Sequence, residues 1–498
     1  MQHEEKVFLD YQKLGLKCGL EVHQQLDTKK LFCDCPSILR QDEPDFTIKR
    51  KLHAVAGESG EVDQAASYQA SLGKEFIYQG YYDNTCLIEL DEEPPHELNK
   101  DALKIALQIS EFLNCKPYPI TQIMRKTVID GSNTSGFQRT LIISHNGYVK
   151  TAYGKVGIQS ISLEEDAARI IKNEKDKTIF RLDRLGIPLV EIATAPDIKN
   201  PEQAKEVALF IGEVLRACKV KRGIGTIRQD VNMSLSFKEI LGKEMPRARM
   251  EIKGVQEPQL IIKTINYEIE RQLELIKQKK KIFPEVRRAL ENGKTEFLRP
   301  MPGADRMYPE TDLSLLKISR ELVNEVKRTM PKLKTEYEEE LRKKGLNNEM
   351  IKLVLDEDKV EVFKELINIL DNPNLVAKTL LLYPKEIASH AGVSIDKVEK
   401  ILNKDIIALI LEILKKGKII EAQIKDVMNK LIQGMSFEEA IQFEKKDMNE
   451  IEEAIMKMIK EKPGLSENAY MGLVMSNLDL RGKIDGKSAK EIIKKLMK

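Results

Sequence analysis

A carboxylate and an imidazole lie two residues apart in segment 16–26, where Glu21 and His23 alternate with apolar residues. Because successive side chains of a β-strand point to opposite faces, both groups share one face, with Leu20 and Val22 on the other. A glutamate and a histidine at this spacing can hold a divalent cation, and oxygen-rich partners elsewhere would favour Mg2+ or Mn2+ over zinc. An exposed polar strand face is the alternative, and it is the commoner one for an isolated Glu-x-His pair.

Segment 224–237 carries a longer row of polar side chains. One face of the expected strand is apolar, and the other carries Thr226, Arg228, Asp230, Asn232 and Ser234. Such a strand packs one side on a core and offers the other to a cleft or to solvent. Asp and Asn are poor strand formers and seldom occur in a strand without a use. A cleft and a solvated face are therefore about equally supported.

Acidic residues mark two further strands. Glu164, Glu165 and Asp166 close the alternating run 156–163, where they supply hard oxygen ligands or form a solvated charge cluster. Glu191 interrupts the apolar strand 187–192. A carboxylate inside an apolar strand costs stability unless it is paired or ligates a cation, which favours a functional role for Glu191.

Basic and small residues combine in segment 125–138. Arg125 and Lys126 precede the turn-rich run from Asp130 to Gln138, whose small residues allow backbone N–H groups to approach a phosphate or carboxylate. A plain loop between strands is the alternative, and composition alone does not reject it.

Three other motifs are weaker. Segment 482–488 resembles a phosphate loop but has three residues between its glycines where four are needed, so we interpret it as a basic turn. Cys33 and Cys35 could form half of a zinc site with Cys86 nearby, but no second Cys-x-x-Cys follows, so reduced structural cysteines are expected. Segment 385–402 has the spacing of a helix-turn-helix but no basic reading face, which favours an ordinary helix pair over a DNA-binding regulator.

A strand-rich scaffold is needed to position these residues. Residues 15 to about 330 alternate short period-two runs with Gly, Pro, Asn and Asp turns, and helices are predicted at 102–113 and 201–217. From about 330, apolar residues recur at spacings of three and four among dense Lys and Glu, which predicts a helical second half. Residues 431–498 suffice for a small separate helical module. The expected class is α+β.

Composition limits the functional classes. The 498 residues carry 81 Lys and Arg against 79 Asp and Glu, a net charge of +2, so no global basic field holds nucleic acid indiscriminately. The terminus 481–498 is the one clear basic patch, with seven Lys or Arg against two acids. No apolar run reaches the roughly 18 residues of a membrane span, and no signal peptide is recognisable, so we expect a cytoplasmic protein without a membrane partner.

A series of segments resembles the B/E subunit family of glutamyl-tRNA(Gln) amidotransferases, and most of all its archaeal E type. The resemblance runs through nearly the whole chain. The segments are Gly19-Leu20-Glu21-Val22-His23-Gln24-Gln25-Leu26, 31–36, 55–58, 85–96, 125–140, 163–167, 184–192, 228–232, 251–253 and 306–312.

This resemblance implies a ligase that phosphorylates the side-chain carboxylate of Glu-tRNA(Gln) with Mg2+ and ATP and then admits ammonia to give Gln-tRNA(Gln). Phosphoryl transfer depends on positioning and on positive charge around the transferred group. The expected metal ligands are Glu21, His23, one of Glu164 and Glu165, and Glu285. The expected phosphate contacts are Arg125, Lys126, Arg184 and Arg228. The expected contacts to the cofactor or to the tRNA acceptor end are Ser135, Gly136, Gln138, Asp230 and Asn232.

The resemblance also implies an antiparallel cradle at 1–330, a helical domain at 331–430 and a tail module at 431–498 that grips the tRNA body. Because the sequence has no nucleophile signature for releasing ammonia, an asparaginase-like D subunit is expected to supply it, in a heterotetramer of two copies each.

Two departures from the family pattern stand out. E-type chains usually carry an inserted domain similar to part of bacterial aspartyl-tRNA synthetases, whereas only about forty residues, 258–300, lie at that place here. Either the chain is naturally compact or the insert was removed. The second cysteine pair of the B type is also missing, which puts a structural zinc in doubt.

The resulting hypothesis is the tRNA-binding, ATP-dependent kinase and transamidase subunit. Its rivals are a nucleic-acid-binding regulator built on the helical half and a tRNA scaffold whose active site lies in a partner.

Overall fold

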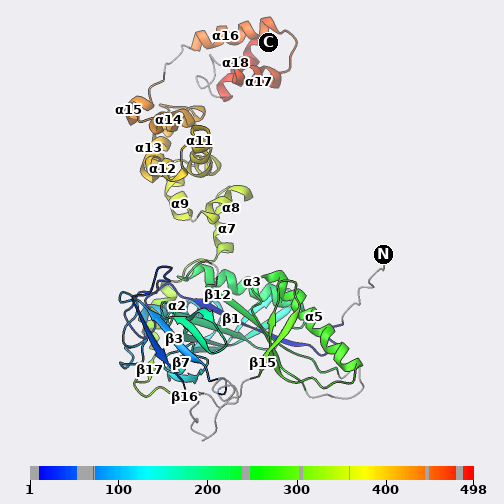
Figure 1. The fold of residues 1–498 in the computed structure, drawn as a ribbon. Coiled ribbons are helices and arrows are strands. Elements are labelled where there is room, and N and C mark those ends of the chain that lie inside the picture. Colours follow the sequence, from blue (N-terminus) through cyan, green and yellow to red (C-terminus); the bar gives the residue numbers. More distant parts are fainter. Residues whose placement is uncertain are drawn as a thin grey trace. The chain divides into compact units, whose positions relative to one another are not determined.

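The chain folds into two compact units, Met1–Pro331 and Lys332–Lys498 (Figure 1). The computed structural model describes residues 10–52, 71, 73–223, 225–237, 247–301, 307–357, 359–443, 448–477 and 486–497. All described strands belong to the first unit, and the described part of the second unit is helical. The α+β class is therefore confirmed.

An 11-stranded sheet organises the first unit, in the order β15-β14-β13-β12-β1-β11-β8-β7-β6-β16, with β4 beside β7. Its neighbours are antiparallel except for β13 and β14. Its strands are β1 (Lys17–Gln25), β4 (Lys116–Pro117), β6 (Met124–Thr127), β7 (Phe137–Thr151), β8 (Gly154–Glu165), β11 (Pro188–Thr194), β12 (Ile227–Ser234), β13 (Met250–Lys253), β14 (Glu285–Ala289), β15 (Thr295–Pro300) and β16 (Met307–Pro309).

Two smaller sheets complete the strands. One has the order β2-β3-β10-β9, with a parallel β3–β10 pair, and the other joins β5 and β17. Their bounds are β2 (Phe46–Arg50), β3 (Glu75–Gly80), β5 (Ile120–Thr121), β9 (Arg169–Asn173), β10 (Lys177–Arg181) and β17 (Leu316–Lys317).

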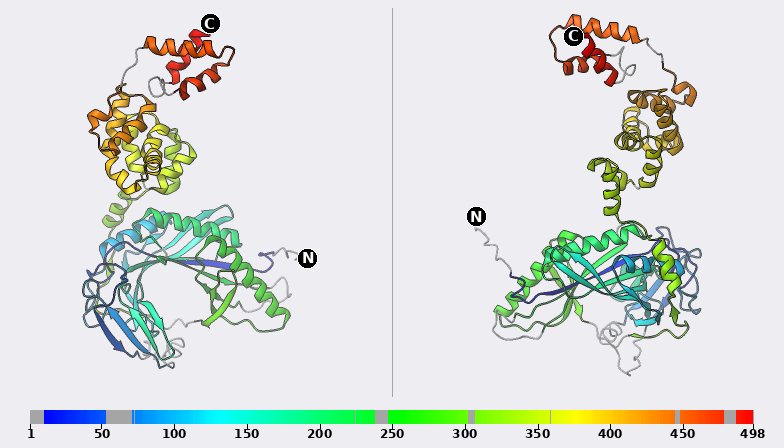
Figure 2. Two further views of the ribbon diagram at one scale, coloured as in Figure 1. Left: turned by 45° about the horizontal axis from the view of Figure 1, so that its top comes forward. Right: turned by 180° about the vertical axis from the view of Figure 1, so that it is seen from behind.

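Helices cover one face of the large sheet. They are α2 (Lys100–Phe112), α3 (Pro201–Ala217) and α5 (Pro258–Lys277), and α6 (Arg320–Arg328) contacts α2. Figure 2 shows α3 and α5 side by side along the sheet. Asn200 caps α3 by accepting a hydrogen bond from the N–H of Gln203, and Pro201 occupies its first turn. The helices predicted at 102–113 and 201–217 are thus confirmed.

Strand β1 shows how this packing exposes the polar face. Cys18, Leu20 and Val22 are buried, and α3 contacts this strand. Because side chains alternate, Glu21 and His23 project from the opposite face of the sheet. The burial of the apolar face therefore directs the two candidate ligands away from the helices.

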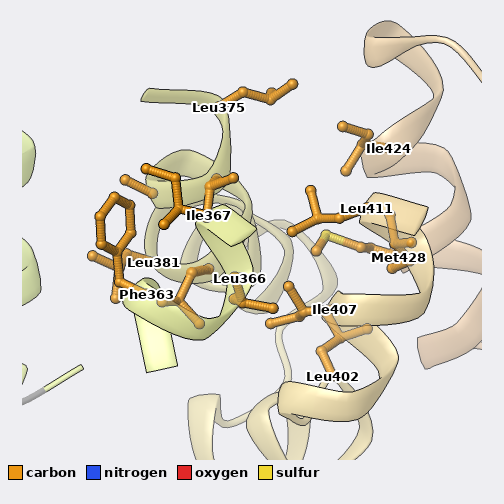
Figure 3. Close-up of a cluster of buried hydrophobic side chains, with 14 of the residues drawn as sticks. Phe363, Leu366, Ile367, Leu375, Leu381, Leu402, Ile407, Leu411, Ile424 and Met428 are labelled. Atoms are coloured by element: carbon orange, nitrogen blue, oxygen red, sulfur yellow. The ribbon is translucent and has the colours of Figure 1, made fainter. Parts of the chain in front are cut away.

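The second unit contains two separate apolar cores. The first is built from helices between Leu341 and Ala440, and Figure 3 shows Phe363, Leu366, Ile407 and Leu411 among its packed side chains. The second, smaller core joins α16, α17 and α18. Leu431 and Ala440, which lie in the range assigned to the tail module, pack in the first core.

The helical elements of this unit are short. They are α7 (Lys334–Lys343), α8 (Asn348–Asp356), α9 (Val360–Ile369), α10 (Pro373–Ala377), η1 (Lys378–Leu382), α11 (Tyr383–Ala391), α12 (Ile395–Ile401), α13 (Lys404–Lys415), η2 (Glu421–Gln423), α14 (Ile424–Ile432), α15 (Phe437–Ala440), α16 (Met448–Glu461), α17 (Glu467–Ser476) and α18 (Gly486–Leu496). Segment 385–402 is the expected helix pair, α11 and α12. In the described part of the chain, no helix combines the length and apolarity that crossing a membrane requires.

Candidate active site

A charged cavity of about 830 Å3 lies in the first unit, against the polar face of the large sheet. Side chains from β1, β6, β7, β8, β11, β12, β13, β15 and β16 line it. Its charged or titratable residues are Glu21, His23, Lys126, Glu164, Asp166, Glu191, Arg228, Asp230, Arg249, Glu251, Lys253 and Arg299. The strand order of the sheet therefore gathers residues that are far apart in the sequence.

Glu21, His23 and Glu191, which we call the cavity cluster, lie at the centre of this arrangement. Strand β1 pairs with β11 so that His23 lies opposite Glu191. The Nε2 atom of His23 is 3.3 Å from a carboxylate oxygen of Glu191 and 3.5 Å from one of Glu21. One imidazole thus lies between two carboxylates.

The protonation of the cavity cluster follows from its surroundings. Burial acts to lower the pKa of His23, but a hydrogen bond with Glu191 and the negative charges of Glu191, Glu164 and Glu21 raise it above its usual value. Burial acts to raise the pKa of Glu191, but the hydrogen bond and charge of His23 lower it to about 2. Burial, reinforced by the charge of Glu191, raises the pKa of Glu21. Within the cavity cluster, two carboxylates therefore share one imidazole.

The cavity cluster has the donors that a divalent cation requires. One ligand atom from each of Glu21, His23 and Glu191 can be chosen so that all lie within 4.8 Å of one another. Carboxylate oxygens suit Mg2+ and Mn2+, and Mn2+ also accepts an imidazole nitrogen. Glu164 lines the same cavity and accepts hydrogen bonds from Gln138 Nε2 at 3.1 Å and Lys126 Nζ at 3.4 Å. These residues therefore fit a hard divalent cation.

Fixed cations line the neighbouring wall. The Nζ atom of Lys253 lies 2.9 Å from Asp230 and 2.8 Å from Glu251, and these two acids raise its pKa against the opposing effect of burial. Arg228 Nη2 lies 3.1 Å from Asp166. Because each cation is held by a carboxylate, its charge is positioned before any ligand arrives.

The unit that contains this cavity matches a known protein family. The GatB/GatE catalytic domain matches residues 16–324. The chain belongs to the GatB/GatE family.

Archaeal members of this family align over nearly the full length. The chain is 37% identical to the E subunit of glutamyl-tRNA(Gln) amidotransferase from Methanocaldococcus jannaschii, covering 98% of this chain and 99% of that protein. Identity is 34% to the E subunits from Thermococcus sibiricus and Methanosarcina acetivorans, each covering 98% of this chain and 99% and 98% of theirs. The first alignment extends over 642 positions, more than the 498 residues here, so that relative has residues without a counterpart in this chain.

In this GatB/GatE family member, the structure gathers about half of the predicted site residues. Those that line the charged cavity are Glu21, His23, Lys126, Gln138, Glu164, Arg228 and Asp230. Asn232 lies at its edge, where its side-chain amide donates to Glu21 at 3.4 Å.

Arg125 and Glu165 lie outside the cavity lining. Each is the sequence neighbour of a cavity residue and points to the other face of its strand. Arg125 pairs with Glu310 and Asp312, and Glu165 pairs with Arg139. Both belong to a buried ion-pair network rather than to the cavity surface.

Arg184 and Glu285 also lie outside the cavity lining. Arg184 donates to the carbonyl oxygens of Ala167 and Ala168, at 2.7 and 3.0 Å, and thereby holds the turn after β8. Glu285 pairs with Arg271 at 3.0 Å and with Arg287 at 2.7 Å. Local pairing thus occupies both side chains.

The predicted loop contributes Gln138 but not Ser135 or Gly136. The hydroxyl of Ser135 donates to the carbonyl of Phe137 at 2.9 Å, and Gly136 has a φ of +77° in the turn that leads into β7. Neither residue lines the cavity. Their role in the structure is to form the turn.

Sequence reasoning missed several cavity residues. Lys253 and Glu251 lie in segment 251–253, whose only signal is the family resemblance, and Arg249 and Arg299 carry no signal. The apolar neighbours of Glu191 in the sequence indicate a functional role for this carboxylate. They do not show that it joins the metal site, because no local pattern places it next to His23. Segment 55–58 and Arg306 lie outside the described residues.

A second group of possible ligands lies away from the charged cavity. One ligand atom each from Cys33, Cys35, Cys86 and Glu89 can be chosen within 4.8 Å of one another. Hydrogen bonds from Cys33 and Cys35 lower the pKa of the Cys86 thiol. The cysteines are free thiols, and thiolates with a carboxylate suit zinc. Glu89 would supply the fourth ligand atom beside the three thiols.

Proposed function

We propose that this chain is the ATP-dependent kinase and transamidase subunit of a glutamyl-tRNA(Gln) amidotransferase. The observation that carries the proposal is a single cavity containing both the cation-binding cavity cluster and fixed Lys and Arg side chains. The relatives, named as E subunits of glutamyl-tRNA(Gln) amidotransferases and aligned over nearly their full length, support the same substrate.

The charged wall suits phosphoryl transfer. The chemistry needs an attacking carboxylate and a triphosphate to approach each other although both are negatively charged. Lys126, Arg228 and Lys253 line the cavity and would offset this repulsion. Glu21, His23 and Glu191, with Glu164 beside them, would hold Mg2+, which when bound neutralises and orients phosphate oxygens.

The proposed reaction has two steps. A side-chain oxygen of the glutamyl group forms a bond to the γ-phosphorus of ATP as the bond to the ADP oxygen breaks. The nitrogen of ammonia then forms a bond to the acyl carbon, the bond to the phosphate oxygen breaks, and the nitrogen gives up a proton. Activation is required because an unmodified carboxylate has no adequate leaving group.

Ammonia and tRNA selection involve other parts of the assembly. An asparaginase-like D subunit is the proposed ammonia source, in a heterotetramer of two copies each, and the helical unit is the proposed support for the tRNA body. Lys490 and Lys494 of α18 lie 3.6 and 4.0 Å from Glu467, and Lys495 lies 2.6 Å from Glu452. These pairings reduce the basic charge that α18 could offer, so tRNA contact would draw on other residues as well.

The compact segment 258–300 is a proposed difference from E-type relatives. It consists of α5, β14 and β15, all of which belong to the sheet or pack on it. No inserted domain would therefore contribute to tRNA selection.

The direct test is ATP turnover by the purified chain with Mg2+, comparing Glu-tRNA(Gln) with uncharged tRNA(Gln). Ammonium chloride is then added and Gln-tRNA(Gln) is assayed. The proposal expects turnover that requires the glutamyl ester, and product once ammonia is present.

The variant Glu21→Gln distinguishes this proposal from the alternative in which the chain is only a tRNA scaffold and the active site lies in a partner. Loss of chemistry with unchanged tRNA affinity would support an active site in this chain. If wild-type chain binds tRNA but shows no turnover with or without its D-type partner, the kinase assignment is wrong.

A further inference from the structure

Gln25 ends β1 on the same face of the strand as Glu21 and His23. It is 2% exposed and does not line the charged cavity. Its backbone is held on both sides, because its N–H donates to the Thr226 carbonyl at 2.9 Å and its carbonyl accepts from the Lys221 N–H at 3.0 Å. A buried glutamine therefore continues the polar row of the cavity cluster and has a fixed place outside the cavity lining.

The side-chain amide of Gln25 makes one strong contact. Its Nε2 atom donates to Asp166 Oδ2 at 2.6 Å, and Asp166 lines the charged cavity. In the described part of the chain, the buried Oε1 atom of Gln25 has no hydrogen-bond partner. The reversed amide would place this oxygen against the carboxylate, so the donor must face Asp166. Because an apolar side chain of the same size would avoid the unpaired acceptor, the bond to Asp166 explains why a glutamine is present.

The carboxylate of Asp166 lies between two guanidinium groups. Its Oδ1 atom accepts hydrogen bonds from Arg228 Nη2 at 3.1 Å and from the Ala167 N–H at 2.9 Å. Arg184 Nε lies 3.8 Å from Oδ2, which is the oxygen that Gln25 holds. Gln25 thus occupies the oxygen nearer Arg184 and keeps the other oxygen on Arg228.

Of these two arginines, Arg228 is the one that a ligand reaches. It lines the charged cavity, and its side chain is 34% exposed. Arg184 directs its guanidinium to the carbonyl oxygens of Ala167 and Ala168, at 2.7 and 3.0 Å. A carboxylate free to turn toward Arg184 would release Arg228, whose planar guanidinium binds oxygens only in defined directions.

We infer that Gln25 is a positioning residue, which acts through Asp166 to hold Arg228 in the orientation that binds a phosphate group of the substrate. The inference rests on the proposed function, which brings phosphate into the charged cavity. Strand β1 would then carry the cation ligands and also support an anion-binding arginine. Fixed placement of this charge before binding avoids reorganisation when the phosphate arrives.

The test removes the amide without changing the size of the side chain. Gln25→Met keeps an unbranched side chain but has no N–H group to donate. Gln24→Met is the matched control, because Gln24 is 4% exposed and donates to two backbone carbonyls, those of Gln25 and Lys221, both at 2.9 Å. Thermal unfolding establishes that each variant is folded. Equilibrium dialysis with inorganic tripolyphosphate and Mg2+ measures phosphate binding, and electron paramagnetic resonance measures Mn2+ binding.

We expect Gln25→Met to weaken tripolyphosphate binding by about tenfold, the size of one lost hydrogen bond to a charged group. Gln24→Met should leave this affinity unchanged, and neither variant should alter Mn2+ affinity. Arg228→Gln should also weaken tripolyphosphate binding. The double variant should bind no more weakly than Arg228→Gln alone, because Gln25 acts only through Arg228.

Losses that multiply in the double variant would overturn the inference, since they would mean that Gln25 supports the sheet in general. Wild-type tripolyphosphate affinity in either single variant would overturn it as well, and so would weaker Mn2+ binding by Gln25→Met. A wild-type chain that shows the expected binding effects but forms no Gln-tRNA(Gln), with or without its D-type partner, would instead refute the proposed function and leave Gln25 as a positioning residue.

Discussion

Two clusters of acidic and basic side chains lie in the first unit, on or beside the large sheet, and differ in the balance of their charges. The cavity cluster has two carboxylates for one imidazole. The second, which we call the arginine network, consists of Arg125, Arg139, Glu165 and Glu310. It pairs two guanidinium groups with two buried carboxylates, and Arg125 also contacts the half-exposed carboxylate of Asp312 at 3.1 Å. Arg125 and Arg139 also lie over the ring of Phe137, at 4.6 and 5.1 Å from its centroid.

Adjacent residues supply the two environments. Lys126, Gln138 and Glu164 line the cavity, whereas their sequence neighbours Arg125, Arg139 and Glu165 form the network. The network is closed because each charge has a partner, and Glu310 is only 1% exposed. A balanced buried network contributes to structure, whereas an unbalanced cluster beside a cavity retains capacity for a cation. Residue type alone therefore does not distinguish a site from a scaffold.

The largest expected effect comes from breaking the cavity cluster. We expect Glu21→Gln to lower the rate of ATP-dependent Gln-tRNA(Gln) formation by about 1000-fold, because it removes an anionic oxygen donor from the proposed Mg2+ site, and the bound cation would offset phosphate charge. Glu165→Gln should leave the rate per folded molecule within about threefold, since its side chain does not reach the cavity. Single-turnover amidation of matched folded fractions measures both. A similar loss of rate in both variants would contradict the distinction between the cavity cluster and the arginine network.

Breaking the arginine network should act on stability instead. Glu310→Gln leaves Arg125 and Arg139 with fewer compensating charges, and we expect it to lower the free energy of unfolding of the first unit by about 3 kcal/mol. Denaturant titration followed by a probe in the first unit measures this. Glu296→Gln, which breaks the exposed pair with Arg288, is the control and should cost less than about 1 kcal/mol. Equal costs would mean that burial does not strengthen the network.

A smaller effect is expected on metal affinity. Glu191→Gln should weaken Mn2+ binding by about 10- to 100-fold, because it removes one oxygen donor and the partner that orients His23. Glu285→Gln should leave Mn2+ affinity unchanged, since Glu285 is paired with Arg271 and Arg287. Electron paramagnetic resonance of free Mn2+ measures both affinities. If Glu285→Gln weakened Mn2+ binding, Glu285 would be a metal ligand.

The smallest effect concerns pH. Burial acts to raise the pKa of Glu310, but hydrogen bonds from Arg125, the Asp312 N–H and Arg139 lower it from 4.5 to about 2. A carboxyl whose folded-state pKa is depressed stabilises the fold above its unfolded pKa and loses that contribution as pH falls through the folded value. The stability difference between wild type and Glu310→Gln should therefore shrink between pH 4.5 and about 2. Unfolding titrations across this range test it, and a constant difference would show that charge on Glu310 is not responsible.

Local sequence patterns determined the elements of the first unit well. The alternation in segment 16–26 predicts which side of β1 is buried, and Cys18, Leu20 and Val22 are indeed buried. The change of periodicity near residue 330 predicts the helical half, and the helices at 102–113 and 201–217 are present. These features follow from the backbone itself, because the strand and helix repeats are fixed by local geometry and recur in the spacing of apolar residues.

Only the tertiary structure decided which polar residues meet. The period of two places Glu164 and Glu165 on opposite faces, but it does not say which face borders the cavity. His23 meets Glu191 because β1 pairs with β11 in one register, and Lys253 meets Asp230 because β13 lies beside β12. Likewise, Cys86 and Glu89 approach Cys33 only through the folding of distant loops. Strand order, register and face selection depend on burying the whole apolar surface at once, so no local pattern in the sequence records them.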